Sequence, residues 1–377
     1  MTTIKGNCDS RFDRVQEIFE SNFENGDEVG ASVALIVDGE MVVDLWGGWI
    51  DEEKTTEWKS DTLVPVYSTS KTMVALCALI LIDRGLLDPY APVAKYWPEF
   101  AANGKENIEV RHIMSHTSGL SGWEQPVTID DVYDWDRATS MLAAQAPWWE
   151  PGTASGYHLV SYNHLVGEVV RRVSGMTPPE FFQQEISGPL GIDYNFGLTE
   201  AIAHRVAPMI PMTSPPLDFA ALDPEGIAMK TIAGPFLGGS AGTPQYLAYP
   251  FTMNGIANAR SIAQAQAVVS HGGFYKGRQL LSQSTLDLIF EEQSRGIDLL
   301  LGMHTSFGIG YAMPGIDWNV IPQGRTCWWA GMGGSRIVNM LDSRATFAYA
   351  MNKMQPSLIG EHRSMDMMDA VVEILES

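Results

Sequence analysis

The chain has 377 residues, of which 45% are hydrophobic and 18% are charged, and its formal net charge is −21. This length leaves room for two or three ordinary domains, and the composition is that of a soluble globular protein with a large buried core. The acidic excess, without any basic run, argues against nucleic acid and anionic membrane surfaces as partners.

The first residues and the cysteines of the chain indicate in which compartment of the cell the protein is found. Residues 1–6 contain no apolar segment like that of a signal peptide, and no stretch is long and apolar enough to span a bilayer. Cys8, Cys77 and Cys327 are odd in number and widely spaced, which favours reduced thiols. We therefore expect a cytoplasmic protein. No spacing of Cys and His suggests a metal site, so we expect no metal and no cofactor.

The first part of the chain predicts a helix, a hairpin and a buried helix. Apolar residues at helical spacing in residues 12–23 predict an amphipathic helix. Residues 31–37 and 40–46 predict two strands, because the Asp-Gly dipeptide between them favours a tight hairpin turn. The apolar run 72–82 is too short to span a membrane and too apolar for an exposed helix. It predicts a buried helix that begins near Ser68.

The rest of the chain changes character twice. Residues 87–300 alternate helical patterns with long loops rich in glycine and proline. Strand patterns then return, followed by a last amphipathic helix over residues 368–375; the predicted strands are residues 307–313, 327–330, 336–341 and 345–351.

This order of elements predicts an α+β fold. Strands at both ends of the chain suggest one antiparallel sheet, covered by the terminal helices. Residues 1–85 and 250–377 would form this α/β subdomain, and residues 86–249 would form a mostly helical subdomain with long loops beside it. We expect the functional site between the two parts, near Ser68.

The motif Ser68-Thr69-Ser70-Lys71 opens the predicted buried helix. Ser68 and Lys71 are one helical turn apart and therefore share a face. A serine hydroxyl becomes a good nucleophile when a base takes its proton. Lysine can be that base here, because burial and the positive end of the helix dipole both disfavour its ammonium form. The competing interpretation is a serine helix cap followed by an exposed lysine, and the motif alone does not decide between them.

Two further segments can complete such a site. Tyr157 follows a turn at residues 149–152 and precedes a helical pattern. Beside a lysine ammonium, a tyrosine can ionise below its usual pKa of about 10 and shuttle protons. The segment from Trp329 to Ser335 is rich in glycine, and small residues at a strand edge let backbone N–H groups approach a substrate. Taken singly, each segment also fits an ordinary structural role, as a packed tyrosine or a tight turn.

Together these segments resemble the serine β-lactamase and penicillin-binding-protein-like superfamily, and more narrowly its family VIII carboxylesterase branch. The resemblance covers most of the chain and is carried by residues 68–71, 92–100, 113–120, 151–153, 157, 165–168 and 331–335. It implies Ser68 as nucleophile, Lys71 as its base partner and Tyr157 as the proton shuttle. It also implies an oxyanion hole made by the backbone N–H groups of Ser68 and Met332.

Two departures from the β-lactamases favour ester substrates. Leu159 stands where β-lactamases carry the Asn of Tyr-x-Asn, so the amide that contacts a β-lactam side chain is absent. Trp329-Ala330-Gly331 replaces Lys-Thr-Gly on the oxyanion strand, as is typical of the esterase branch, and this removes a cation for the β-lactam carboxylate. Trp329 offers an apolar wall and one N–H donor instead. We expect Trp329 and Gly331 to contact the substrate.

A competing motif at residues 238–242, Gly-Gly-Ser-Ala-Gly, fits the nucleophile elbow of α/β-hydrolases around Ser240. That elbow needs an apolar strand before it and a helix after it, whereas prolines flank this segment. The His-Gly-Gly at residues 271–273 follows the serine, although the oxyanion loop of that fold precedes it. We therefore interpret residues 238–242 as a Gly-rich loop. His116 is interpreted as a hydrogen-bonded core histidine and not as a base.

These observations predict a serine hydrolase, specifically a carboxylesterase that cleaves short- to medium-chain carboxylic esters through an acyl-enzyme on Ser68. The alternatives are a β-lactamase, a peptidase or amidase acting on D-amino-acid substrates, and an acyltransferase on the same fold. A binding protein with an inactive site is a further alternative, because fold does not fix function. The expected partner is a small-molecule ester. The natural ester, the acyl chain length and the oligomeric state, homo-oligomers included, stay open.

Overall fold

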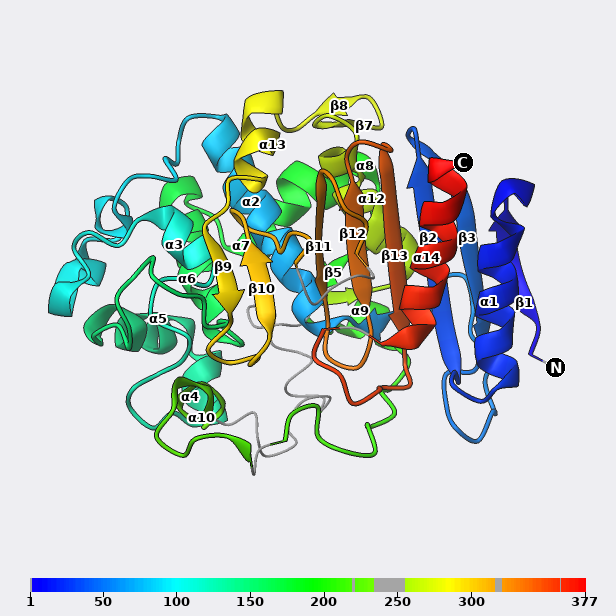
Figure 1. Cartoon of the computed structure of the whole chain (residues 1–377), viewed down its shortest axis with the longest axis horizontal. Helices are drawn as coiled ribbons and strands as arrows, with labels where there is room; N and C mark the ends of the chain where they lie inside the picture. Colours follow the sequence, from blue (N-terminus) through cyan, green and yellow to red (C-terminus); the bar gives the residue numbers. More distant parts are fainter. Residues whose placement is uncertain (1, 219–220, 234–254, 316–320, 360) are drawn as a thin grey trace.

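One antiparallel sheet joins the two ends of the chain (Figure 1). The computed structural model describes residues 2–218, 221–233, 255–315, 321–359 and 361–377. The strand order is β1-β3-β2-β13-β12-β11, and β2 pairs with β13 where the two chain ends meet. The strands are β1 (Ile4–Cys8), β2 (Gly30–Val37), β3 (Glu40–Gly48), β11 (Thr326–Ala330), β12 (Arg336–Met340) and β13 (Ala345–Met351).

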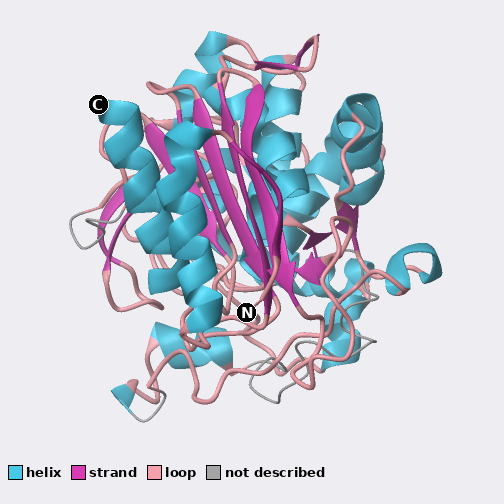
Figure 2. Cartoon of the chain, turned by 90° about the vertical axis from the view of Figure 1, so that its right-hand side faces the viewer, coloured by secondary structure: helices cyan, strands magenta, loops and turns pink. Residues whose placement is uncertain are grey.

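Helices cover both faces of this sheet, and Figure 2 shows the strands between them. The terminal helices α1 (Asp13–Glu24) and α14 (His362–Glu376) pack against each other on one face. On the other face, α12 (Ala259–Ser270) packs against β2, β12 and β13. Helix α2 (Lys71–Asp83) lies between α12 and the helices of residues 86–249, which are called the middle segment below. In that segment α2 contacts α6 (Ser161–Ser174). Every residue of α2 from Lys71 to Leu81 is buried, as its unbroken apolar run predicts.

Apart from α6, the middle segment is built of short helices, and three small sheets of two or three strands lie outside the main sheet: β4-β6-β5, β7-β8 and β9-β10. Its other helices, with the later α13, are α3 (Val110–Met114), α4 (Ile129–Tyr133), α5 (Trp135–Ala144), α7 (Pro178–Phe182), α8 (Gly188–Leu190), α9 (Glu200–Ala203), α10 (Ile227–Ile232) and α13 (Gln283–Ile289). The minor strands are β4 (Val64–Pro65), β5 (Asn195–Phe196), β6 (Gly255–Ala257), β7 (Phe274–Tyr275), β8 (Arg278–Gln279), β9 (Ser294–Ile297) and β10 (His304–Phe307). None of the helices in the part of the chain described here has both the length and the apolar character needed to cross a bilayer.

The predicted α+β fold, with its antiparallel sheet built from both chain ends, is confirmed. The Asp38-Gly39 turn has the positive φ values, 49° and 87°, that its sequence favours. The strand predicted for residues 307–313 is wrong, because β10 ends at Phe307. Gly310, with φ of 88°, turns the chain away from an extended path. The division into subdomains at residues 85 and 250 stays a prediction.

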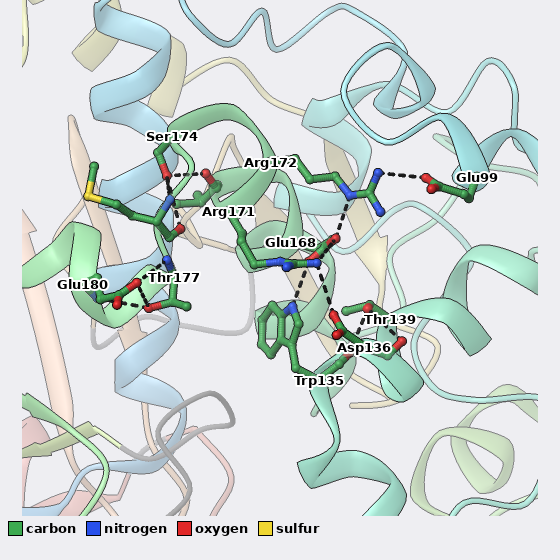
Figure 3. A network of polar contacts seen from close by, with 12 residues as sticks. Glu99, Trp135, Asp136, Thr139, Glu168, Arg171, Arg172, Ser174, Thr177 and Glu180 are labelled. Carbon is green, nitrogen blue, oxygen red and sulfur yellow. Dashed lines mark hydrogen bonds and ion pairs between the residues drawn. The ribbon is translucent and has the colours of Figure 1, made fainter.

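A buried carboxylate organises the helical segment (Figure 3). The side chain of Glu168 on α6 is fully buried, and it accepts hydrogen bonds from Arg171 at 2.7 and 2.9 Å and from Arg172 at 2.6 Å. The indole N–H of Trp135 donates to it at 2.7 Å, and Arg172 also donates to Glu99 at 2.8 Å. Burial alone would raise the pKa of Glu168, but these hydrogen bonds lower it below its ordinary value.

Replacing Glu168 with glutamine should therefore destabilise the protein. We expect a loss of about 3 kcal/mol in the free energy of unfolding, at the lower end for buried ion pairs because both arginines keep contact with solvent. Since the pKa of Glu168 is lowered, its contribution is present above the unfolded-state pKa of about 4.3 and is lost as pH falls through the folded-state pKa. Urea unfolding at pH 7 and at low pH would measure this, and the variant and wild type should converge at low pH.

The matched control is Asp136→Ala. Asp136 pairs with Arg171 at 3.3 Å, but its side chain is 82% exposed. The change in unfolding free energy should stay within about 1 kcal/mol, as for other exposed ion pairs. Equal losses for the two variants at pH 7 would show that burial of Glu168 does not set the strength of this network.

Candidate active site

The candidate nucleophile lies in a tight turn at the start of α2. Ser68 belongs to the 3-10 turn of Tyr67–Ser70, which runs directly into α2 at Lys71. Tyr67, immediately before the serine, has a φ of 45°, which is unusual for an aromatic residue and is found at turns under strain. Ser68 is only 4% exposed. The sequence correctly predicted a buried helix that begins near this serine.

Lys71 lies against the serine, as the spacing predicts. Its Nζ is 3.1 Å from Ser68 Oγ and donates to the backbone carbonyl of Leu159 at 2.8 Å. Lys71 is fully buried, and this burial lowers the pKa of its amine well below the usual lysine value. The exposed lysine of the helix-cap interpretation is therefore ruled out. A neutral amine at hydrogen-bond distance from a hydroxyl can accept its proton.

Tyr157 also belongs to this cluster. Its hydroxyl accepts a hydrogen bond from the Trp329 indole N–H at 3.2 Å and also makes a hydrogen bond with the Ser68 side chain. Lys71 Nζ lies 5.0 Å from the centre of the Tyr157 ring. The structure thus brings Tyr157 and Trp329, from two distant parts of the sequence, to Ser68 and Lys71.

The expected direction of the Tyr157 pKa is wrong. Burial raises this pKa above the usual tyrosine value, and the hydrogen bonds from Ser68 and Trp329 offset only part of that rise. The phenol is therefore neutral near pH 7 and can act as a proton donor. The neutral partner that can receive a proton is Lys71, whose pKa moves the other way.

The loop after β11 is pressed against the nucleophile turn. Ser335 Oγ donates to the Val66 carbonyl at 2.8 Å and lies 3.0 Å from Thr69 Oγ1. A Cβ on Gly331 would come within 2.2 Å of the Val66 carbonyl oxygen, so only glycine permits this approach. Met332 is the next residue in this loop. The contacts therefore hold the Met332 backbone in a segment fixed next to Ser68.

The outer side of the same loop is also held. The Gly333 N–H donates to the Ser357 carbonyl at 2.9 Å, and the Gly333 carbonyl accepts from the Gln355 N–H at 2.9 Å. The buried Arg363 donates to that carbonyl at 3.2 Å and pairs with Glu28 at 2.8 Å. Sequence reasoning missed Arg363, because it lies in the terminal helix outside any motif.

Two histidines named in the sequence have structural partners. His116 Nδ1 accepts the His158 backbone N–H at 3.1 Å, and burial lowers the pKa of His116 well below its usual value. The interpretation of His116 as a hydrogen-bonded core histidine is confirmed. His271 Nε2 accepts the Gly39 N–H at 2.7 Å, so it ties α12 to the β2–β3 turn. Ser240, in the competing Gly-x-Ser-x-Gly motif, lies outside the described residues.

A cavity of about 280 Å³ is lined by residues that follow the Tyr157 segment in the chain and by residues of the helical part. Val160, the residue after Leu159, forms part of its wall, together with Trp123, Trp148 and Lys230. Its volume is at the lower end of small-molecule sites, and the aromatic walls suit apolar groups. Within the described ranges, no group of three or more His, Cys, Asp or Glu side chains is placed to hold a metal ion.

Comparisons with known proteins agree with this geometry. Residues 15–371 match the family model for β-lactamases. The esterase/β-lactamase LipL of Mycobacterium tuberculosis is 31% identical over an alignment 379 residues long. The alignment covers 94% of this chain and 84% of LipL. A family VIII carboxylesterase of known structure has 34% identity and a TM-score of 0.89, covering 99% of this chain and 100% of that one. A penicillin-binding protein homologue from Caulobacter crescentus has 35% identity and a TM-score of 0.93, with the same coverage.

Proposed function

The chain belongs to the β-lactamase family and is a serine hydrolase, and we propose that it is a carboxylesterase acting through an acyl-enzyme on Ser68. Its substrates would be short- to medium-chain carboxylic esters. The observation that carries this proposal is the 3.1 Å contact between Lys71 Nζ and Ser68 Oγ, made by a buried amine whose pKa is lowered. The similarity to LipL and to a family VIII carboxylesterase supports ester chemistry.

In the proposed acylation step, Ser68 Oγ attacks the ester carbonyl carbon while its proton moves to the Lys71 amine. The carbonyl oxygen becomes an oxyanion, which the N–H groups of Ser68 and Met332 would stabilise. When the bond to the alcohol breaks, the Tyr157 hydroxyl gives its proton to the leaving oxygen. The Lys71 ammonium then returns a proton to Tyr157, which restores both groups.

Deacylation uses Lys71 a second time, first as base and then as acid. A water molecule attacks the acyl carbonyl carbon, and its proton passes to the neutral Lys71 amine. The bond to Ser68 Oγ breaks, the serine regains its proton from Lys71, and the carboxylic acid leaves. No charge has to be carried out of the buried cluster, because each proton transfer is completed between neighbouring residues.

The surroundings of Trp329 favour a neutral substrate. Its indole N–H donates to Tyr157, so its aromatic face is what it would offer to an ester. The missing side chain of Gly331 would let the loop after β11, which carries Met332, lie against the nucleophile turn. We propose that the cavity with Trp123 and Trp148 in its wall takes one end of the ester. Trp329 and Gly331 stay predicted substrate contacts.

The substrate class is tested by comparing esters with a β-lactam. We expect kcat/KM for p-nitrophenyl butyrate to exceed that for nitrocefin by about tenfold or more, equal to about 1.4 kcal/mol of transition-state stabilisation. The reason is that Trp329 stands where β-lactamases place a lysine for the lactam carboxylate. Both substrates are measured at equal enzyme concentration, with Ser68→Ala as the background. A nitrocefin value equal to or above the ester value would make the β-lactamase alternative the better one.

A further inference from the structure

The turn between β9 and β10 carries a buried carboxylate that the proposed mechanism does not use. Asp298 is 0% exposed, although its neighbours Ile297 and Leu299 are 59% and 37% exposed. The chain thus places its charged residue inside and its apolar residues outside, the reverse of the usual arrangement. A buried carboxylate without hydrogen-bond partners would be costly, so its contacts indicate what it does.

Those contacts reach the catalytic tyrosine proposed above. Asp298 Oδ1 accepts the backbone N–H of Tyr157 at 3.0 Å, as well as those of Leu300 at 2.9 Å and Leu301 at 3.0 Å. Beside it, the Leu299 N–H donates to the Ser155 carbonyl at 2.8 Å. One carboxylate oxygen therefore closes the hairpin turn and holds the segment that leads into Tyr157.

We propose that Asp298 is a positioning residue for Tyr157, and this inference rests on the proposed function. The backbone of Tyr157 is held by Asp298, and its hydroxyl is held by hydrogen bonds with Trp329 and Ser68. Burial raises the pKa of Asp298, and the N–H groups of Leu301, Tyr157 and Leu300 oppose that rise because they stabilise the charged form. Hydrogen bonds to the charged carboxylate are stronger than neutral ones. Fixing both ends of the side chain keeps the phenol aligned with the oxygen of the leaving group.

The choice of leaving group separates this role from a merely structural one. Ethyl butyrate releases an alkoxide that must be protonated as it leaves, whereas p-nitrophenyl butyrate releases a stable phenolate that needs no proton. Both esters give the same butyryl-enzyme, so a difference between them reports acylation alone. A misplaced Tyr157 should therefore slow the ethyl ester selectively.

For Asp298→Ala we expect kcat/KM for ethyl butyrate to fall by about tenfold or more, with a much smaller fall for p-nitrophenyl butyrate. Asp298→Asn keeps an acceptor oxygen but loses the charge, so its loss should be smaller and selective for the same ester. Adding Asp298→Ala to Tyr157→Phe should cause little further loss, because both changes act on one group. Arg295→Ala, at an exposed position on the same hairpin, should leave both esters unchanged.

Two outcomes distinguish the inference from the proposed function. If Tyr157→Phe shows the selective loss and folded Asp298 variants do not, the positioning role is overturned. If Tyr157→Phe itself slows both esters equally, the proton-shuttle role of Tyr157 fails. Should Asp298→Ala not fold, the folded Asp298→Asn variant decides, and an unchanged ratio of the two esters would count against the inference.

Discussion

Replacing Ser68 with alanine should abolish hydrolysis of p-nitrophenyl butyrate, with kcat lower by on the order of 10⁴-fold or more. Without the hydroxyl no acyl-enzyme can form, and only binding and oxyanion stabilisation remain. The fold should survive, since the change removes one buried oxygen from the turn before α2. Steady-state rates, together with the thermal unfolding midpoint, measure both effects.

The control for this variant is Ser240→Ala, in the competing Gly-x-Ser-x-Gly motif. That serine should be dispensable, because a nucleophile elbow requires a strand before it and a helix after it, and the prolines that flank the motif in the sequence argue against both. The Ser240→Ala enzyme should retain most of the activity. If the two results were exchanged, the α/β-hydrolase interpretation would be correct and the assignment to Ser68 would be abandoned.

Lys71→Ala and Tyr157→Phe should each slow acylation by ethyl butyrate by about 10²-fold or more, as the loss of a positioned acid or base does. Removing the amine leaves the Ser68 proton without an acceptor. Removing the phenol leaves the alkoxide without a proton donor. Single-turnover rates with ethyl butyrate separate these effects from deacylation. Near-normal acylation by Tyr157→Phe would remove Tyr157 from the mechanism and leave Lys71 acting alone or through water.

The same assignment fixes the pH dependence of the wild-type enzyme. Lys71 must be neutral to accept a proton. Because Lys71 and Tyr157 titrate together, kcat/KM should fall when the pH drops below the pKa at which this pair takes up a proton and Lys71 becomes charged. Because burial lowers the pKa of Lys71 and raises that of Tyr157, the required forms coexist over a broad range. The rate should rise to a plateau on the neutral-to-alkaline side. A decline through that range would contradict the neutral-lysine assignment.

Features set by neighbouring residues could be predicted from the sequence. The β2–β3 hairpin follows from two strand-forming runs on either side of Asp38-Gly39, and the buried helix α2 follows from an unbroken apolar run. Ser68 and Lys71 share a face because they are one turn apart, so their contact could be predicted before any packing was known. The sequence also predicted the confirmed α+β fold class from the order of its elements.

Features that depend on packing between distant segments could not be predicted. Asp298 and Tyr157 are 141 residues apart, and no pattern in either segment points to the other. The direction of the Tyr157 pKa is likewise not predictable from the sequence, because the motifs indicate a nearby lysine but not the burial, which is the larger effect and raises this pKa. The predicted strand over residues 307–313 is wrong because Gly310, with a φ of 88°, turns the chain there.

The central claim is that Ser68 is the nucleophile, and covalent labelling tests it most directly. A fluorophosphonate probe should label the folded wild-type protein with a stoichiometry of about one, since an activated serine attacks phosphorus as it attacks a carbonyl carbon. Peptide mass spectrometry should place the adduct on Ser68, and Ser68→Ala should show none. An adduct on Ser240, or no labelling of the folded protein, would contradict the claim.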